Sequence, residues 1–205
     1  PRWELRVGAR FDNFEQEILN RANNRRIKQD DERVSPQIGL VFAATDAVSV
    51  YGVYGEGFRA LSGADFAGNV FDPNTSDAME AGIKFQLNDG KLNGNLSVYR
   101  INQENILSSD PVNAGFQVAA GEAGSQGFEF DLTGEVLPGL QAWFSYSYTD
   151  AATDNNVLDP DFGLVVRAGD RLLNVPRHSL AVQVVKETTL ANRPLRLGAG
   201  MNYVG

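Results

Sequence analysis

Residues 77–98 read DAMEAGIKFQLNDGKLNGNLSV and carry the clearest structural signal in the chain. Apolar and polar residues alternate on both sides of Asn88-Asp89-Gly90. The apolar set is Ala81, Ile83, Phe85, Leu87, Leu92, Leu96 and Val98, and the polar set is Glu80, Lys84, Gln86, Asn93, Asn95 and Ser97. Successive strand residues point to opposite faces, and Asn-Asp-Gly supplies the positive φ angles of a tight hairpin. The stretch predicts an antiparallel hairpin with one apolar and one polar face.

The same rhythm extends in both directions from this hairpin. Further tight turns are predicted at 45–47, 137–140 and 191–194, and longer polar stretches at 20–34, 59–76, 108–115 and 150–174. The strands predicted between them are 3–19, 36–44, 48–58, 77–87, 91–107, 116–136, 140–149, 177–187 and 195–204. No segment has a convincing helical pattern. We therefore expect an all-β chain of about nine antiparallel strands.

Short turns and long loops alternate strictly, which gathers the long loops at one end of the sheet. Strands of about ten residues with this alternation are typical of a transmembrane β-barrel. A β-sandwich usually has strands of about five or six residues. A soluble β-sandwich that binds carbohydrate or protein nevertheless remains an alternative at this point, because it too has one wet and one dry face.

Composition excludes several kinds of site. The chain has no cysteine and one histidine, and its net charge is −8. Thiolate chemistry and multi-histidine metal sites are therefore excluded, and a nucleic-acid partner is not expected. His178 is followed by Ser179, but neighbours on a strand point to opposite faces and cannot form a nucleophile–base pair. We expect no catalytic residue, no metal site and no cofactor.

Four stretches resemble, in order, motifs of the TonB-dependent siderophore receptors of bacterial outer membranes. They are SPQIGLVF with VSVYGVYGEGFR at 35–59, DAMEAGIK at 77–84, GEAGSQGFEFD at 121–131 and LLNVPRHS at 172–179. Three positions depart from the family pattern. Ala60 replaces a proline, Ala78 an aromatic residue and Gln126 an arginine, and these departures leave the subfamily and the ligand open.

The resemblance implies that residues 1–205 form part of a large antiparallel transmembrane β-barrel, an open fragment without the plug domain and the final strands. Such a receptor sits in the outer membrane of a Gram-negative bacterium and imports a ferric siderophore. It contacts outer-membrane lipid, works as a monomeric barrel, and draws energy from the TonB complex through its plug domain. The chain would then be no enzyme. Vitamin B12, haem, a nickel chelate or a glycan are alternative cargoes.

Two groups of candidate site residues follow. Aromatic residues expected near the loop end could contact the chelate, with an arginine to meet its negative charge. They are Phe58, Arg59, Phe66, Phe71, Phe116 and Trp143. Their alternative role is packing in loops or against lipid. Charged residues of the polar face could hold the plug, or could be polar because the lumen is wet. They are Glu80, Lys84, Glu129 and Asp131.

Overall fold

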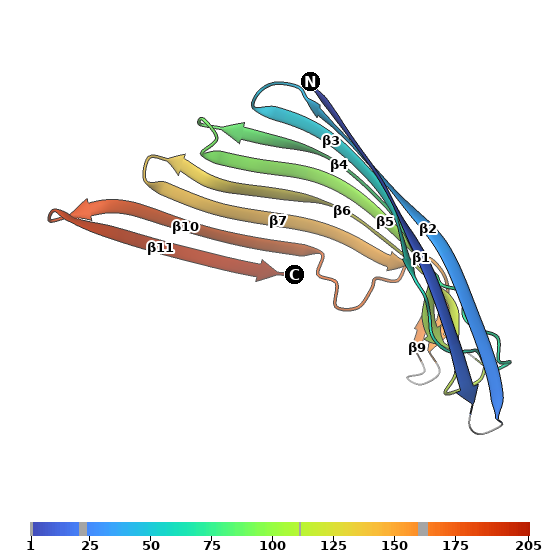
Figure 1. Cartoon of the computed structure of the whole chain (residues 1–205). Helices are drawn as coiled ribbons and strands as arrows, with labels where there is room; N and C mark the ends of the chain where they lie inside the picture. The colour runs from blue at the N-terminus through green and yellow to red at the C-terminus, as the bar shows by residue number, and fades with distance from the viewer. Residues whose placement is uncertain (1, 21–23, 111, 160–163) are drawn as a thin grey trace.

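The computed structural model describes residues 2–20, 24–110, 112–159 and 164–205, and these form a curved antiparallel sheet of nine strands (Figure 1). Each strand pairs with the strand of this sheet that follows it along the chain, in the order β1-β2-β3-β4-β5-β6-β7-β10-β11. Their bounds are β1 Trp3–Asn20, β2 Arg25–Ala43, β3 Val48–Arg59, β4 Asn74–Leu87, β5 Leu92–Ser109, β6 Gln117–Leu137, β7 Leu140–Thr153, β10 His178–Leu190 and β11 Arg193–Val204. The connection from β7 to β10 contains a separate two-stranded sheet, formed by β8 Val157–Asp159 and β9 Leu164–Val166. The described residues contain no helix that could span a membrane.

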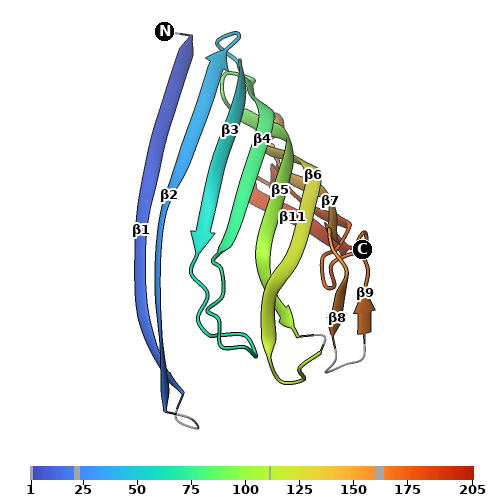
Figure 2. The ribbon, with the colours of Figure 1, turned by 90° about the vertical axis from the view of Figure 1, so that its right-hand side faces the viewer.

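The nine predicted strands are confirmed, but the prediction of a loop at 20–34 is wrong. β2 begins at Arg25, and its register with β1 runs without interruption from Asn20↔Arg25 to Trp3↔Phe42. The pairs in this region are polar, such as the Arg26–Glu17 ion pair at 2.6 Å. This part of the hairpin extends beyond the neighbouring strands (Figure 2), so its outer face lies beyond the continuous apolar rungs of the sheet and its concave face meets the β3–β4 connection. A ribbon of that kind needs no apolar alternation, which is why its pattern resembled a loop.

Cross-strand pairing divides the side chains into two continuous faces. One rung crosses all nine strands on the apolar face. It consists of Trp3, Phe42, Val50, Ile83, Leu96, Phe130, Tyr146, Leu180 and Tyr203. The adjacent rung on the opposite face is Glu4, Val41, Tyr51, Gly82, Ser97, Glu129, Ser147, Ser179 and Val204. The rungs differ sharply in polarity, although each residue of one rung directly neighbours a residue of the other.

The polar face is the more enclosed of the two. Leu96 is 43% exposed on the apolar face, whereas its neighbour Ser97 is 2% exposed on the polar face. The sheet is curved (Figures 1 and 2), and side chains on a concave surface crowd together while those on a convex surface spread apart. The polar residues therefore line the concave side and the apolar residues cover the outside. This arrangement requires an apolar medium around the sheet.

The two ends of the sheet differ as predicted. At one end the strands join through tight turns, and Asn88, Asp89 and Gly90 have φ angles of 52°, 54° and 82°. At the other end lie the longer connections between β3 and β4, between β5 and β6, and between β7 and β10. The large loops therefore gather at one rim, where they can form a joint surface.

Candidate functional site

The β3–β4 connection folds back onto the concave side of the β1–β2 hairpin. The Gln29 Nε2 atom donates a hydrogen bond to the Phe71 carbonyl at 3.1 Å, and the Ser62 hydroxyl donates to Gln16 Oε1 at 2.8 Å. Leu61 and Phe71 are buried in this contact. The connection is therefore a packed element rather than a solvated loop.

An aspartate near the tip holds the same connection in shape. The Asp65 carboxylate accepts hydrogen bonds from the backbone and side-chain nitrogens of Asn69, at 2.8 and 2.9 Å. These bonds from Asn69 lower the pKa of Asp65 below its ordinary value, because they stabilise the charged form. Phe66 follows this aspartate and is held at the surface.

The β5–β6 connection uses the same device. The Asp110 carboxylate accepts a hydrogen bond from the Asn113 side-chain nitrogen at 2.9 Å. It also accepts hydrogen bonds from the backbone nitrogens of Val112 and Asn113, at 2.8 and 3.0 Å. The bonds from Asn113, its side-chain nitrogen above all, lower the pKa of Asp110. The connection ends at Phe116, which leads into β6.

Phe66 and Phe116 bring the two connections together. Their ring centroids are 5.1 Å apart and the planes are nearly perpendicular, at 89°. Edge-to-face pairs of this kind are favourable, yet the two side chains remain 59% and 42% exposed. Two of the predicted ligand-contact residues thus form one exposed aromatic surface, and each lies on a connection that an aspartate holds in shape.

On the concave face, Tyr51 organises the charged residues. Its hydroxyl donates to Glu80 Oε1 at 2.5 Å and lies 3.3 Å from Asn95 Oδ1. The Lys84 Nζ atom lies 4.8 Å from the centre of the Tyr51 ring. The ring reaches these partners by lying across Gly82, where an added Cβ would stand 2.7 Å from the ring. Tyr51 therefore fixes the Glu80 carboxylate at the wall.

A second tyrosine repeats this arrangement two strands further on. The Tyr99 hydroxyl lies 2.9 Å from Thr149 Oγ1, and the side chain crosses Gly127, whose added Cβ would stand 2.9 Å from the Tyr99 oxygen. Beside it the wall forms a hollow of about 700 Å³. Glu80 and Glu129 border this hollow, and small residues such as Gly55 and Ser125 line it.

The whole chain, residues 1–205, matches a family model described as TonB dependent receptor-like, beta-barrel. The chain belongs to this family. The metal-pseudopaline receptor CntO of Pseudomonas aeruginosa is 35% identical over 100% of this chain and 29% of its own length. The ferrichrome outer membrane transporter/phage receptor of Escherichia coli K12 is 28% identical over 97% of this chain and 26% of its own length. This receptor chain therefore spans less than a third of these relatives.

Solved structures show the same fold. The siderophore receptor PiuA from Acinetobacter baumannii superposes with a TM-score of 0.78 at 23% identity, over 99% of this chain and 31% of that one. Members of the family are outer-membrane proteins, and this receptor chain is part of one. The apolar outside of the sheet consequently faces lipid. The soluble sandwich, which was the alternative from the sequence, is excluded.

The remaining candidates of the receptor chain do not belong to the aromatic pair. Phe71 is 5% exposed, so it packs the β3–β4 connection and offers no surface to a ligand. Trp143 lies near the start of β7, at the short-turn end, so its expected place at the loop end was wrong. By its place in the alternation of β3, Phe58 belongs to the outer face. Arg59, the next residue, belongs to the concave face and is exposed.

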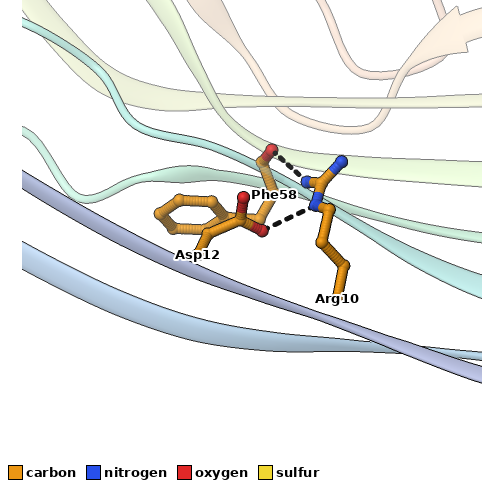
Figure 3. A network of polar contacts seen from close by, with 3 residues as sticks. All are labelled: Arg10, Asp12 and Phe58. Carbon is orange, nitrogen blue, oxygen red and sulfur yellow. Dashed lines mark hydrogen bonds and ion pairs between the residues drawn. The ribbon is translucent and has the colours of Figure 1, made fainter.

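Sequence reasoning missed the arginines that join β1–β2 to β3. The pairing of β2 with β3 ends at Gln37↔Gly55, and the strands part beyond it. The Arg10 Nη2 atom donates to the Phe58 carbonyl at 3.2 Å while its Nε atom bonds Asp12 at 2.7 Å (Figure 3). Arg33 also reaches β3, through Glu56 at 3.1 Å. No local pattern indicates contacts between residues so far apart in sequence.

The predicted lumen residues are placed on one face. The alternation along β4 and β6 places all four on the concave side: Glu80, Lys84, Glu129 and Asp131. His178 points to the outer face, where its Nδ1 atom lies 2.9 Å from the Tyr146 hydroxyl, and Ser179 has the opposite parity. Within the described part of the chain, no three His, Cys, Asp or Glu residues are grouped closely enough to hold a metal ion.

Proposed function

We propose that the full-length protein containing this chain imports a ferric siderophore across the outer membrane. The chain would supply part of the barrel wall and the loops around the entrance, as a partial barrel domain in a monomeric receptor. The observation that carries the proposal is a sheet with an apolar outside and an enclosed polar inside, whose whole length matches the receptor family. Such a wall encloses a polar passage through lipid.

The exposed aromatic pair supports a role in binding the chelate. Phe66 and Phe116 offer rigid apolar surface at the loop end, and aromatic side chains lose little conformational entropy on binding. Arg59 is the last residue of β3, at the loop end, and has no ion-pair partner among the described residues. It could meet the negative charge of the chelate. Phe58 and Trp143 are weaker candidates, because one has outer-face parity and the other lies at the opposite end.

The charged residues of the concave face support a second role. Glu80 and Glu129 border the hollow, and neither has a cationic partner within hydrogen-bonding distance among the described residues. We propose that they hold the plug domain through ion pairs, with Lys84 and Asp131 contributing further toward the short-turn end. The TonB complex would act on that plug.

A second cargo is favoured by one relative. The receptor that is 35% identical over the whole chain is named for metal-pseudopaline. Its name admits a chelate of a metal other than iron, and a chelate of that kind would present a similar oxygen-rich surface to the loops. The two cargoes differ in the metal that the receptor would supply to the cell, so measurements of metal uptake distinguish them.

Uptake measurements test the proposed function. Cells that lack the gene, or carry it in full length, would be grown with limiting iron, and separately with limiting zinc or nickel, in the presence of individual chelators. We expect one ferric siderophore to restore growth only through the intact gene. Rescue by a zinc or nickel chelate alone would establish the second cargo, and rescue by no metal chelate would contradict both.

Variants of the purified full-length receptor test the loop surface. Phe66→Ala and Phe116→Ala should each weaken chelate binding by about tenfold, the effect of losing one aromatic contact. Trp143→Ala is the matched control, since it removes an exposed aromatic residue of the concave face at the other end. Equal affinities of all three variants would exclude the aromatic pair from the binding surface.

A further inference from the structure

The β5–β6 hairpin bends partway to its loop end. Its register shifts once between Gln103 and Ile106 and again between Ile106 and Leu107. The first shift places an extra residue on β5 and the second an extra residue on β6, so the pairing beyond them has its original offset. A β-bulge bends and twists the strand that carries it, and both strands change direction toward the loop end (Figure 2). The hairpin therefore leans at this point and still continues as a regular ladder.

Asn105 builds the first of these two bulges. It has a left-handed backbone, with a φ of 57°. Asparagine adopts this conformation more readily than most residues, whereas a β-branched residue is strained in it. On the opposite strand Gly121 pairs with Ile106, and a Cβ added there would stand 2.9 Å from the Ile106 carbonyl oxygen. The bend therefore depends on the residue types at positions 105 and 121.

Side-chain amides tie this bulge to the end of the β3–β4 connection. The Asn105 Nδ2 atom donates to the Pro73 carbonyl at 2.9 Å, and the Gln103 Nε2 atom donates to Asn74 Oδ1 at 2.8 Å. The Asn74 amide donates in turn to the Glu104 carbonyl. Asn74 is buried, so these bonds are sheltered from water. The backbone ladder between β4 and β5 ends here, and this amide clasp of Asn74, Gln103 and Asn105 continues the join beyond it.

The amide clasp lies at the base of the two segments that carry the aromatic pair. Pro73 ends the connection that holds Phe66, and Asn105 marks the bend of the hairpin whose connection ends at Phe116. The two rings meet edge to face and stay substantially exposed, and a single contact of that kind is weak. It does not by itself hold two long connections in one relative position against their conformational entropy. The clasp supplies a second join between them.

We propose that Asn105 is a positioning residue for ligand binding, which sets the lean of the β5–β6 hairpin and thereby holds Phe116 against Phe66. The amide clasp fixes the direction of the hairpin at its base, and the aromatic pair forms only when that direction is correct. Asn105 acts through the hairpin and not through contact with the ligand. The binding role of the aromatic pair rests on the proposed function, whereas the geometry that Asn105 sets does not.

Fluorine NMR of the purified full-length receptor, with fluorophenylalanine at position 116, tests the positioning. Phe66→Ala gives the reference signal of an unpaired ring. We expect Asn105→Val to move the signal to this reference, because valine is strained at a φ of 57°. Asn105→Gly should give an intermediate signal, since glycine adopts this φ freely but has no amide to donate to Pro73.

Asn192→Val is the matched control for backbone strain. Asn192 has a φ of 60° in the turn between β10 and β11, at the opposite end of the sheet. The control should therefore lose stability as Asn105→Val does, yet keep the wild-type fluorine signal. If Asn105→Val does not fold, the intermediate signal of Asn105→Gly decides. A wild-type signal in the variants of Asn105, or an equal displacement in Asn192→Val, would overturn the proposal.

Binding of the chelate that restores growth through the intact gene gives a second readout. We expect its affinity to fall about tenfold in Asn105→Val, about threefold in Asn105→Gly and not measurably in Asn192→Val. An unchanged affinity in Asn105→Val together with a displaced signal would contradict the role of Asn105 in binding. If no chelate restores growth, the proposed function fails alone, because the fluorine signal still shows whether Asn105 positions the aromatic pair.

Discussion

Leu96 and Ser97 are neighbours on β5, yet they belong to opposite environments. Leu96 continues an apolar rung through all nine strands and is substantially exposed, while Ser97 is enclosed among polar residues. In a water-soluble sheet the exposures would be reversed. The difference between the convex and the concave face shows that the sequence is adapted to two media, lipid outside and an aqueous lumen inside.

The two faces also differ in how specific their contacts are. Most contacts on the convex face are apolar and tolerate exchange among apolar residues. The concave face carries defined hydrogen bonds, such as those of Tyr51 and Tyr99, and these require glycines beneath the rings. Substitutions on the convex face should therefore act through polarity, and those on the concave face through shape.

The largest expected effect comes from placing a charge in the apolar rung. Leu96→Arg should destabilise the full-length receptor by about 2–4 kcal/mol, the cost of arginine at the bilayer midplane. Gln183→Arg places the same new residue on the concave face at an exposed position of β10, and it should cost far less. Urea unfolding in lipid vesicles measures both variants. Equal destabilisation would contradict the assignment of the two faces.

A smaller effect is expected from filling a concave-face glycine. Gly82→Ala would place a methyl group 2.7 Å from the Leu96 carbonyl and from the Tyr51 ring, and should cost about 1–3 kcal/mol. Gly52→Ala, on the outer face, meets nothing closer than the Glu80 carbonyl at 3.9 Å, and should stay within about 0.5 kcal/mol of the wild type. The same unfolding measurement compares them. A larger loss for Gly52→Ala would show that crowding does not distinguish the faces.

Alternation in the sequence was enough to predict the strands and the faces, because one apolar medium imposes one period on every strand. It failed between residues 25 and 34, where the β1–β2 hairpin extends beyond the other strands and neither of its faces meets the apolar medium. The end of the sheet at which Trp143 lies was predicted wrongly, although the turn at 137–140 just before it carried the information.

The candidate site was predicted in part. Phe66 and Phe116 were singled out as aromatic loop residues, but their contact depends on how two connections pack, and no periodicity reports this. The buried position of Phe71 depends in the same way on the β1–β2 hairpin. Glu80 and Glu129 were placed on the correct face by parity alone.

The two tyrosine–glycine pairs sharpen the comparison further. Tyr51→Phe and Tyr99→Phe each remove one hydroxyl and should each cost about 1 kcal/mol. Only Tyr51 bonds a carboxylate. In a Glu80→Gln background the cost of Tyr51→Phe should therefore change, whereas that of Tyr99→Phe should not. Identical coupling energies for both tyrosines would show that Tyr51 has no particular relation to Glu80.

The smallest expected effect concerns acid pH at the loop end. The pKa values of Asp65 and Asp110 are lowered by bonds that favour their charged forms. A carboxylate with a lowered pKa stabilises its loop above about pH 4, its unfolded value, and that contribution is lost as the pH falls through the folded pKa. Fluorine NMR of a fluorophenylalanine at position 66 should therefore report a single environment at neutral pH and increasing mobility below about pH 4.

Asp110→Asn serves as the control for this titration. The amide keeps one acceptor oxygen but has no charge, so the β5–β6 connection should already be looser at neutral pH and should lose its share of the acid transition. Since Phe116 leaves the aromatic pair when this connection loosens, the signal from position 66 should shift toward its acid form in the variant at pH 7. An unchanged transition in Asp110→Asn would mean that the two connections move independently, and that the Phe66–Phe116 contact does not couple them.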